Sequence, residues 1–337
     1  MKITDIDFYR CPISLTKLEL RDSHSADDQI ITGSLVSETG NFFPIENGIP
    51  DFTWPKELRE VDLKTRELYD NLARDYDKFA DIPFKTYYQN EIDIRESITD
   101  RLRINENSRI LEVGGGDGRG AYHILKRLGK DGRLFFQELS SSFLRSATNR
   151  LKGYEDKIEF SLANASYLSF PDNSFDAAHH FGGINTFSEI KRCLSEMARV
   201  VKPGGKVVVG DEGIGPWLRD SEFGKIMINS NPLVGCDVPI NLLPEEARDV
   251  KVEWIMMGAF FLIEFTVGDG SPVGNYHIPI PSERGGTHWT RYYGKLEGIT
   301  DSSKKLAYEA QQKSGKSMSD WLDDIVKAAA HQQLKIK

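Results

Sequence analysis

The chain has 337 residues, of which 39% are hydrophobic and 28% charged, and its formal net charge at pH 7 is −8. This composition is typical of a globular protein, and the length allows two domains or one large domain with appendages. The acidic balance argues against a nucleic-acid partner, because phosphate binding needs clustered Lys and Arg. Three widely spaced cysteines indicate a reduced, cytoplasmic protein. We expect no signal peptide and no membrane span, since no apolar run approaches about 20 residues.

Residues 1–56 are predicted to form a small β-rich domain, with strands at 30–36 and 41–45 around a turn. Through Cys11, Pro12 and the stretch 43–50, this segment resembles the zinc-ribbon-like domain found alone or in front of some bacterial rRNA methyltransferases. Those relatives carry two Cys-x-x-Cys pairs, and here only Cys11 remains. A structural zinc site needs about four ligands. We therefore expect no metal.

From residue 57 onward the pattern changes to helices and then to alternating strands and helices. The segment 57–104 is helical and charged, and the alternation that follows predicts a parallel sheet with helices on both faces. An antiparallel hairpin over 250–267 closes the sheet. We expect a long functional loop at 268–298 and then two helices, the second at about 317–330. The resulting domains are 1–56, 57–267 and 268–337. The strands are expected at 109–113, 133–137, 157–162, 175–179 and 206–210, and the helices at 120–128, 142–151 and 188–200.

The most informative segment is the glycine cluster of residues 114–120, which lies between the first strand and a helix. Glycines are required where the backbone turns sharply and a ligand lies directly against it. The cluster predicts a nucleotide-like cofactor, and an enzyme is the leading interpretation. The glycine pattern alone also fits dinucleotide binding, so its surroundings must decide.

The surroundings of the glycine cluster favour S-adenosylmethionine over a nicotinamide cofactor. Glu112 precedes the loop by two residues, where its carboxylate can approach a cationic amino group and would repel a pyrophosphate. Glu138 follows the second strand and can accept hydrogen bonds from ribose hydroxyls, as in both cofactor classes. Two further motifs occupy 160–176 and 197–209.

With these motifs, residues 65–267 resemble the class I S-adenosylmethionine-dependent methyltransferases, and most closely the small-molecule branch that includes quinone C-methyltransferases. The resemblance implies an α/β, Rossmann-like sheet of seven strands, one of them antiparallel, with a β-rich N-terminal domain and a C-terminal helical extension. It also implies the cofactor contacts. These are Gly114, Gly116 and Gly118 in the loop, Glu112 at the methionine end, Glu138 at the ribose, Leu139 at the adenine face, Asn164 and Ala165 at the adenine edge, and His180 at the end of the fourth strand.

Catalytic residues are less clearly marked, because methyl transfer needs a base only where the acceptor must lose a proton. His179, Asp211 and His288 are candidates, although His179 equally suits packing and Asp211, like its neighbour Glu212, equally suits a helix cap. An acceptor site should combine apolar surface with a few polar groups. Candidates for this surface are Tyr69, Tyr76, Tyr88, Trp289 and Arg291.

Other interpretations remain open at this stage. The N-terminal domain suggests an rRNA methyltransferase, against which the acidic charge and the missing zinc ligands argue. A cofactor-binding scaffold without catalytic activity also fits, since the motifs speak only for cofactor binding. The stretch 308–322 is similar to the paired helices of ribbon-helix-helix proteins. A plain helical hairpin, packed on the domain or on the second subunit of a homodimer, is the preferred interpretation there.

Overall fold

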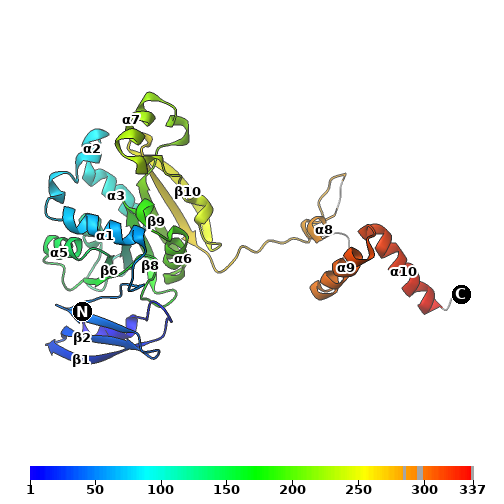
Figure 1. The fold of residues 1–337 in the computed structure, drawn as a ribbon, viewed down its shortest axis with the longest axis horizontal. Coiled ribbons are helices and arrows are strands. Elements are labelled where there is room, and N and C mark those ends of the chain that lie inside the picture. The colour runs from blue at the N-terminus through cyan, green and yellow to red at the C-terminus, as the bar shows by residue number, and fades with distance from the viewer. Residues whose placement is uncertain (284–285, 294–298, 335–337) are drawn as a thin grey trace. The chain divides into compact units, whose positions relative to one another are not determined.

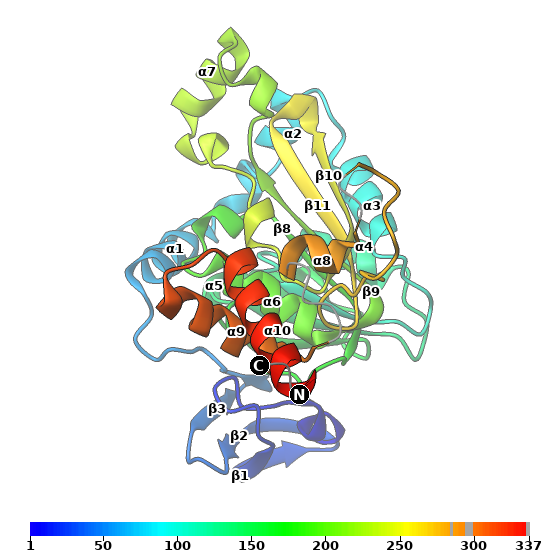
Figure 2. The same cartoon turned by 90° about the vertical axis from the view of Figure 1, so that its right-hand side faces the viewer.

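The computed structural model describes residues 1–283, 286–293 and 299–334, and Figures 1 and 2 show its fold. The chain divides into two compact units, Met1–Pro272 and Val273–Lys337. The larger unit contains a four-stranded sheet near the N-terminus and a central seven-stranded sheet.

The central sheet has the strand order β10-β11-β9-β8-β5-β6-β7. The strands from β9 to β7 are parallel, whereas β11 runs antiparallel to both β9 and β10. The predicted seven-stranded sheet with one antiparallel strand is thus confirmed. Its strands are β5 Arg109–Val113, β6 Arg133–Glu138, β7 Ile158–Leu162, β8 Phe175–Phe181, β9 Val201–Glu212, β10 Ala247–Ile255 and β11 Phe260–Val267.

Helices cover both faces of the central sheet, as the alternation predicts. Apolar residues of α3, α4 and α5 pack on one face, and those of α6 pack on the other. In α6, residues 193, 194, 197 and 198 are all buried, which is the spacing that places side chains on one side of a helix. The helices of this unit are α1 Glu60–Leu72, α2 Ile82–Thr86, α3 Glu91–Arg101, α4 Arg119–Leu125, α5 Ser141–Arg150, α6 Ile190–Val200 and α7 Glu222–Ser230.

The N-terminal sheet consists of β1 Leu18–Ala26, β2 Gln29–Ser37, β3 Phe42–Glu46 and β4 Ile49–Pro50. Sequence patterns predict β2 and β3 but not β1, because β1 is mostly exposed and polar and lacks an apolar alternation. Cys11 is fully buried among apolar side chains. Within the described residues, no group of three or more His, Cys, Asp or Glu is arranged to hold a metal ion.

Aromatic side chains join the N-terminal sheet to the central one. Phe8 packs on Phe135 of β6 with ring centroids 4.7 Å apart, and Tyr9 packs on Phe170 at 5.4 Å. The backbone N–H of Phe52 donates to the carbonyl of Leu162 in β7 at 2.8 Å. Both sheets therefore share one apolar core.

The second unit contains α8 His288–Tyr293, α9 Asp301–Ser314 and α10 Met318–Leu334. The helix α8 lies in the stretch 268–298 that the sequence predicts as a loop, and residues 284–285 and 294–298 of that stretch lie outside the described residues. Thr300 caps α9 through its side chain, and Gly315 ends it in the left-handed conformation. None of the helices in the described ranges has the length and apolar character that crossing a bilayer requires.

Candidate functional site

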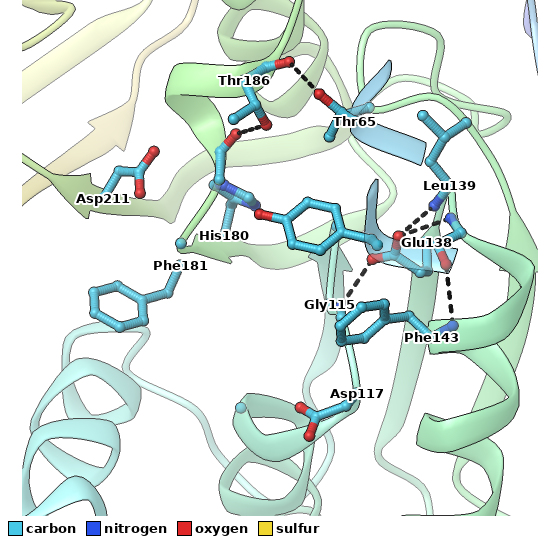
Figure 3. Close-up of a pocket in the computed structure, with 18 of the residues that line it drawn as sticks. Thr65, Gly115, Asp117, Glu138, Leu139, Phe143, His180, Phe181, Thr186 and Asp211 are labelled. Carbon is cyan, nitrogen blue, oxygen red and sulfur yellow. Dashed lines mark hydrogen bonds between the residues drawn. The ribbon is translucent and has the colours of Figure 1, made fainter. Parts of the chain in front are cut away.

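A cavity of about 250 Å³ lies at the carboxyl ends of β5, β6, β8 and β9, where parallel α/β sheets place their ligand sites (Figure 3). One side of α1 closes it with Asp62, Thr65, Arg66 and Tyr69, which are spaced to share one helix face. Most of the predicted site residues line this cavity. They are Glu112, Gly114, Gly116, Glu138, Leu139, Asn164, Ala165, His179, His180, Asp211, Tyr69 and Tyr76.

The glycine loop connects β5 to α4 beneath this cavity. Gly118 stands at the N-cap of α4 with φ +84°, a conformation that side chains rarely adopt. A Cβ added to Gly115 would lie 2.2 Å from the ring of Phe136. Gly118 does not line the cavity itself; it shapes the turn that brings Gly114 and Gly116 to the cavity wall.

Glu138, at the end of β6, is fastened to the glycine loop. One carboxylate oxygen accepts the backbone N–H of Gly116 at 2.8 Å, and the other accepts those of Leu139 and Ser140 at 2.8 and 2.9 Å. Burial raises the pKa of this carboxyl, while the three N–H donors act in the opposite direction. The side chain is therefore fixed at the cavity wall, and the one unused lone pair, on Oε2, can accept a further donor.

Glu112 and His179 lie side by side on β5 and β8, where the strand register pairs them directly. The Nδ1 atom of His179 is 3.6 Å from Oε1 of Glu112. Oε2 of Glu112 and both ring nitrogens of His179 are buried without a hydrogen-bond partner. A Cβ on Gly120 would come within 2.6 Å of Oε1 of Glu112, so a side chain at this position would displace the carboxylate from the place it occupies here. Such unpaired buried groups are costly unless a ligand completes them.

His180 points from the next position of β8 to the opposite side of the sheet. Its Nδ1 donates to the carbonyl of Val113 at 2.7 Å, so Nε2 carries the lone pair, and Nε2 has no partner. Burial lowers the pKa of this imidazole to about 4. His180 is therefore neutral near pH 7, and Phe187 packs on its ring.

Two aspartates eight residues apart fasten α1 over the cavity. Near its N-terminus, Asp62 accepts the backbone N–H and the hydroxyl of Ser188 at 3.0 and 2.6 Å. Near its C-terminus, Asp70 accepts the hydroxyl of Ser140 at 2.6 Å and the N–H of Ser142 at 3.0 Å. The helix is thus bound to the loop before α6 and to the start of α5.

Tyr76 reaches the cavity from a short 3-10 helix, Tyr76–Lys78, that follows α1. Its neighbour Asp77 forms ion pairs with Arg119 and Arg150. Both arginines also pair with Asp117 of the glycine loop. These contacts hold Tyr76 close to the loop, and its ring packs edge-on against Phe143 at 4.9 Å.

A pair of acidic residues ends β9 on the other side of the cavity. Asp211 is buried and accepts the N–H groups of Asn185 and Glu212 at 2.8 Å each. Glu212 accepts the side-chain amide of Asn231. Burial, reinforced by repulsion from Asp211, raises the pKa of Glu212 to about 7. In Figure 3, Asp211 and Glu138 lie on opposite sides of His180.

The part of the cavity near Glu212 is mainly apolar. It is bounded by α2, the end of β8, the start of β11 and the segment after α7. Phe181 and Phe260 pack against each other there, with ring centroids 6.0 Å apart. One cavity therefore joins a polar end, around Glu112 and Glu138, to an end suited to an apolar molecule. The apolar lining residues are Ala80, Pro83, Phe84, Phe181, Leu233 and Phe260.

Residues 57–212 match the model of the ubiE/COQ5 methyltransferase family. Together with the strand order and the cavity at the carboxyl ends of the strands, this match decides the domain type. Residues 57–212 have the fold of a class I methyltransferase domain, and this segment is called the methyltransferase domain below.

Among curated proteins, the methyltransferase domain is similar to enzymes named ubiquinone/menaquinone biosynthesis C-methyltransferase UbiE. The protein from Hahella chejuensis is 29% identical over 155 residues, covering 45% of this chain and 61% of that protein. The one from Francisella tularensis subsp. novicida is 29% identical over 167 residues, covering 49% and 66%. The chain thus spans less than two thirds of either relative. A solved phosphoethanolamine N-methyltransferase 2 from Haemonchus contortus has a TM-score of 0.49 and 15% identity, covering 68% of this chain and 63% of that chain.

Some predicted residues lie outside the cavity of the methyltransferase domain. Tyr88 is 89% exposed and is not part of the lining, because it follows α2 at a positive φ that turns it outward. His288, Trp289 and Arg291 belong to the second unit, in and around α8. The structure therefore places Tyr88 away from the cavity, and it describes the other three residues only within their own unit.

Several residues of the methyltransferase domain line the cavity without having been candidates. Asp62, Thr65 and Arg66 come from α1, and their mixed chemistry gives no motif. The signal that could have found them is their spacing, which places them on one helix face with Tyr69. Phe84 follows Pro83 in the first turn of α2, and its pattern in the sequence is the same as that of an ordinary core residue.

Proposed function

We propose that the protein is an S-adenosylmethionine-dependent methyltransferase acting on a small, largely apolar acceptor of the quinone type. The observation that carries this proposal is the single cavity with two chemically different ends. Carboxylates and the glycine loop form one end, and aromatic and aliphatic side chains form the other. Such a cavity suits a polar cofactor beside an apolar partner.

The residues at the polar end fit S-adenosylmethionine. The unpaired, buried Oε2 of Glu112 is suited to the cationic amino group of the methionine moiety. Glu138, held by three backbone N–H groups, has one lone pair left, on Oε2, for a ribose hydroxyl. A pyrophosphate in the same place would be repelled by the carboxylate of Glu112. When bound, the cofactor would supply an electrophilic sulfonium methyl group.

The apolar end would orient the acceptor and exclude water around it. Glu212 is the residue we expect to take a proton from an acceptor hydroxyl, because its carboxyl has a pKa near the working pH. Asn231 binds the Glu212 carboxyl and fixes its direction. Asp211 raises the proton affinity of Glu212 by repulsion while keeping its own oxygens on backbone N–H groups.

The names of the similar proteins support an acceptor of the quinone class, since those proteins are named for C-methylation in ubiquinone and menaquinone biosynthesis. The net charge of −8 disfavours a polyanionic acceptor such as rRNA. We also infer a cytoplasmic location from the three free cysteines. The exposed Leu306, Ile325 and Val326 of α9 and α10 are the surface at which we expect a homodimer to form.

The test of this proposal is a transfer assay with methyl-labelled S-adenosylmethionine. The acceptors are a panel of hydroquinones and simple phenols, with total RNA as a separate arm. We expect label in a hydroquinone product extracted into organic solvent, and its loss in Glu112→Ala. Label in RNA would replace this proposal with the rRNA alternative. Cofactor binding without transfer to any acceptor would favour the non-catalytic scaffold.

A further inference from the structure

A buried hydrogen bond links the helix α1, which covers one side of the cavity, to the loop after β7. The side-chain amide of Asn164 donates from Nδ2 to Oδ2 of Asp62 at 3.3 Å. Both side chains are about 95% buried, and both line the cavity. They are 102 positions apart in sequence. The part of the cavity where we expect the adenine base is therefore built from two segments that are far apart in sequence.

The direction of the Asn164 amide is fixed by its partners on both sides. Nδ2 faces a carboxylate, which can only accept, and Oδ1 accepts the backbone N–H of Ser166 at 3.0 Å. Asp62 itself cannot turn freely, because the N–H and the hydroxyl of Ser188 hold its two oxygens. Reversing the amide would place an NH₂ group against the N–H of Ser166 and an oxygen against the carboxylate.

The fixed direction of the Asn164 amide determines which ligand groups can bind to Asn164 and Asp62. Oδ2 of Asp62 already accepts hydrogen bonds from both Asn164 and Ser188, so the acceptor sites left on the pair are one on Oδ1 of Asn164 and one on Oδ1 of Asp62. Oxygen lone pairs match an exocyclic amino group and repel a carbonyl oxygen. A site built to pair with an NH₂ group rejects an analogue that lacks it, since buried polar groups are then left unpaired.

We propose that Asp62 is a positioning residue that orients Asn164, and that the pair selects a 6-amino purine over a 6-oxo purine in the part of the cavity where we expect the base. This inference rests on the proposed cofactor. It assigns a second role to α1: the helix that covers one side of the cavity also orients the side chain expected to face the purine base. The N–H of Ser166 alone favours one direction of the Asn164 amide, and the carboxylate of Asp62 adds the repulsion that excludes the reversed direction.

The competing explanation is that Asp62 only docks α1 onto the domain. Asp70 provides a matched control, because it lies on the same helix and also binds a serine hydroxyl and a serine N–H. It is not among the residues that line the cavity. A docking role predicts the same outcome for both aspartates, whereas a positioning role separates them.

The experiment is calorimetric titration of the full chain and its variants with S-adenosylhomocysteine and with S-inosylhomocysteine, which carries a 6-oxo purine. We expect the unmodified chain to prefer the adenosyl ligand at least about tenfold. Asp62→Ala should weaken adenosyl binding and shrink that preference several-fold. Asp70→Ala should weaken both ligands by the same factor and leave the preference unchanged. Equal preferences in Asp62→Ala and the unmodified chain would overturn the inference.

A second pair of variants keeps the inference testable if Asp62→Ala does not fold. Asn164→Asp places a second carboxylate about 3.3 Å from Asp62, and like charges at that distance repel. We expect this variant to bind S-adenosylhomocysteine about tenfold less tightly at pH 8, and Asp62→Asn added to it to restore most of the loss. Unchanged or tighter binding by Asn164→Asp alone would overturn the inference. If the unmodified chain binds neither ligand, the proposed cofactor itself is wrong.

Discussion

The carboxylate of Glu138 accepts the backbone N–H of Gly116 across a gap of 22 residues, at 2.8 Å. This hydrogen bond joins the end of β6 to the loop that follows β5. Each of these two segments therefore restrains the position of the other at the polar end of the cavity. The second carboxylate oxygen binds the first N–H groups of the loop before α5. Glu138 therefore shapes the site in addition to offering a lone pair to a ligand.

Removing this carboxylate should weaken cofactor binding. We expect Glu138→Ala to lower the binding free energy of S-adenosylhomocysteine by about 1.5–3 kcal/mol, the range for hydrogen bonds to a charged group. Calorimetry measures this directly. Glu155→Ala is the control, because Glu155 also accepts a backbone N–H, from Gly153, but is exposed and outside the cavity. Equal losses in the two variants would contradict a specific role for Glu138.

Because Gly120 has no side chain, the carboxylate of Glu112 can lie next to it. A side chain at position 120 should displace this carboxylate. A Cβ at position 120 would lie 2.6 Å from Oε1 of Glu112. We expect Gly120→Ala to weaken S-adenosylhomocysteine binding about tenfold or more. Adding Glu112→Asp, which shortens the carboxylate by one methylene, should recover part of the affinity. A Gly120→Ala variant with unchanged binding would show that the position of Glu112 is not important.

The raised pKa of Glu212 predicts a pH dependence. Because the carboxyl titrates at about 7, the form that can accept a proton increases through that pH, and so should the transfer rate for hydroxylated acceptors. Glu212→Gln should lower kcat by roughly 10²–10⁴-fold, as for a lost general base, and should remove the rise. Its affinity for S-adenosylhomocysteine should not change. A retained rise near pH 7 in this variant would assign the titration to another group.

The same pKa predicts how stability varies with pH. The carboxyl binds its proton more tightly in the folded protein than at its ordinary value of 4.5. Its stabilising contribution is therefore full below about pH 4.5 and is lost as the pH rises through about 7. Glu212→Gln should gain stability relative to the unmodified chain on going from pH 5 to pH 9. Thermal unfolding at both pH values checks this; a difference that is independent of pH would contradict it.

The shared core predicts that the N-terminal sheet and the methyltransferase domain unfold together. Phe52 is fully buried and packs on Tyr9 with ring centroids 5.1 Å apart. We expect Phe52→Ala to cost about 3–5 kcal/mol and to lower a single transition of residues 1–272. Phe42→Ala, on the exposed face of the same sheet, should change stability by only about 0.5 kcal/mol. Two separate transitions would show that the sheets fold independently.

Much of the central sheet could be predicted because its strands, loops and helices are each marked by a sequence pattern, and these patterns agree with one fold. The strand 109–113, the glycine loop and the following helix lie together in sequence, and the structure places β5 at Arg109–Val113 and α4 at Arg119–Leu125. The antiparallel hairpin of β10 and β11 was likewise visible as two apolar runs around a glycine. In contrast, β1 is polar and exposed, and its place in a sheet depends on pairing with β2.

Of the residues that line the cavity, the sequence could predict mainly those that lie at the ends of strands. Glu112, Glu138 and Asp211 end parallel strands, so topology alone brings them to one edge. Asp62 comes from a helix whose packing depends on Ser188 and Asn164, more than 100 residues away. No local pattern contains that pairing. The pKa of Glu212 is likewise a product of burial and could not be predicted from its position beside Asp211.

The central claim is that this cavity holds S-adenosylmethionine and not a nicotinamide cofactor. The most direct measurement is calorimetric titration of the full chain with S-adenosylhomocysteine and, separately, with NAD. Glu112 lines the cavity beside the glycine loop, where its carboxylate would repel a pyrophosphate. The account predicts saturable binding of S-adenosylhomocysteine with one site per chain, and no binding of NAD at the same concentrations. Binding of NAD without binding of S-adenosylhomocysteine would contradict it.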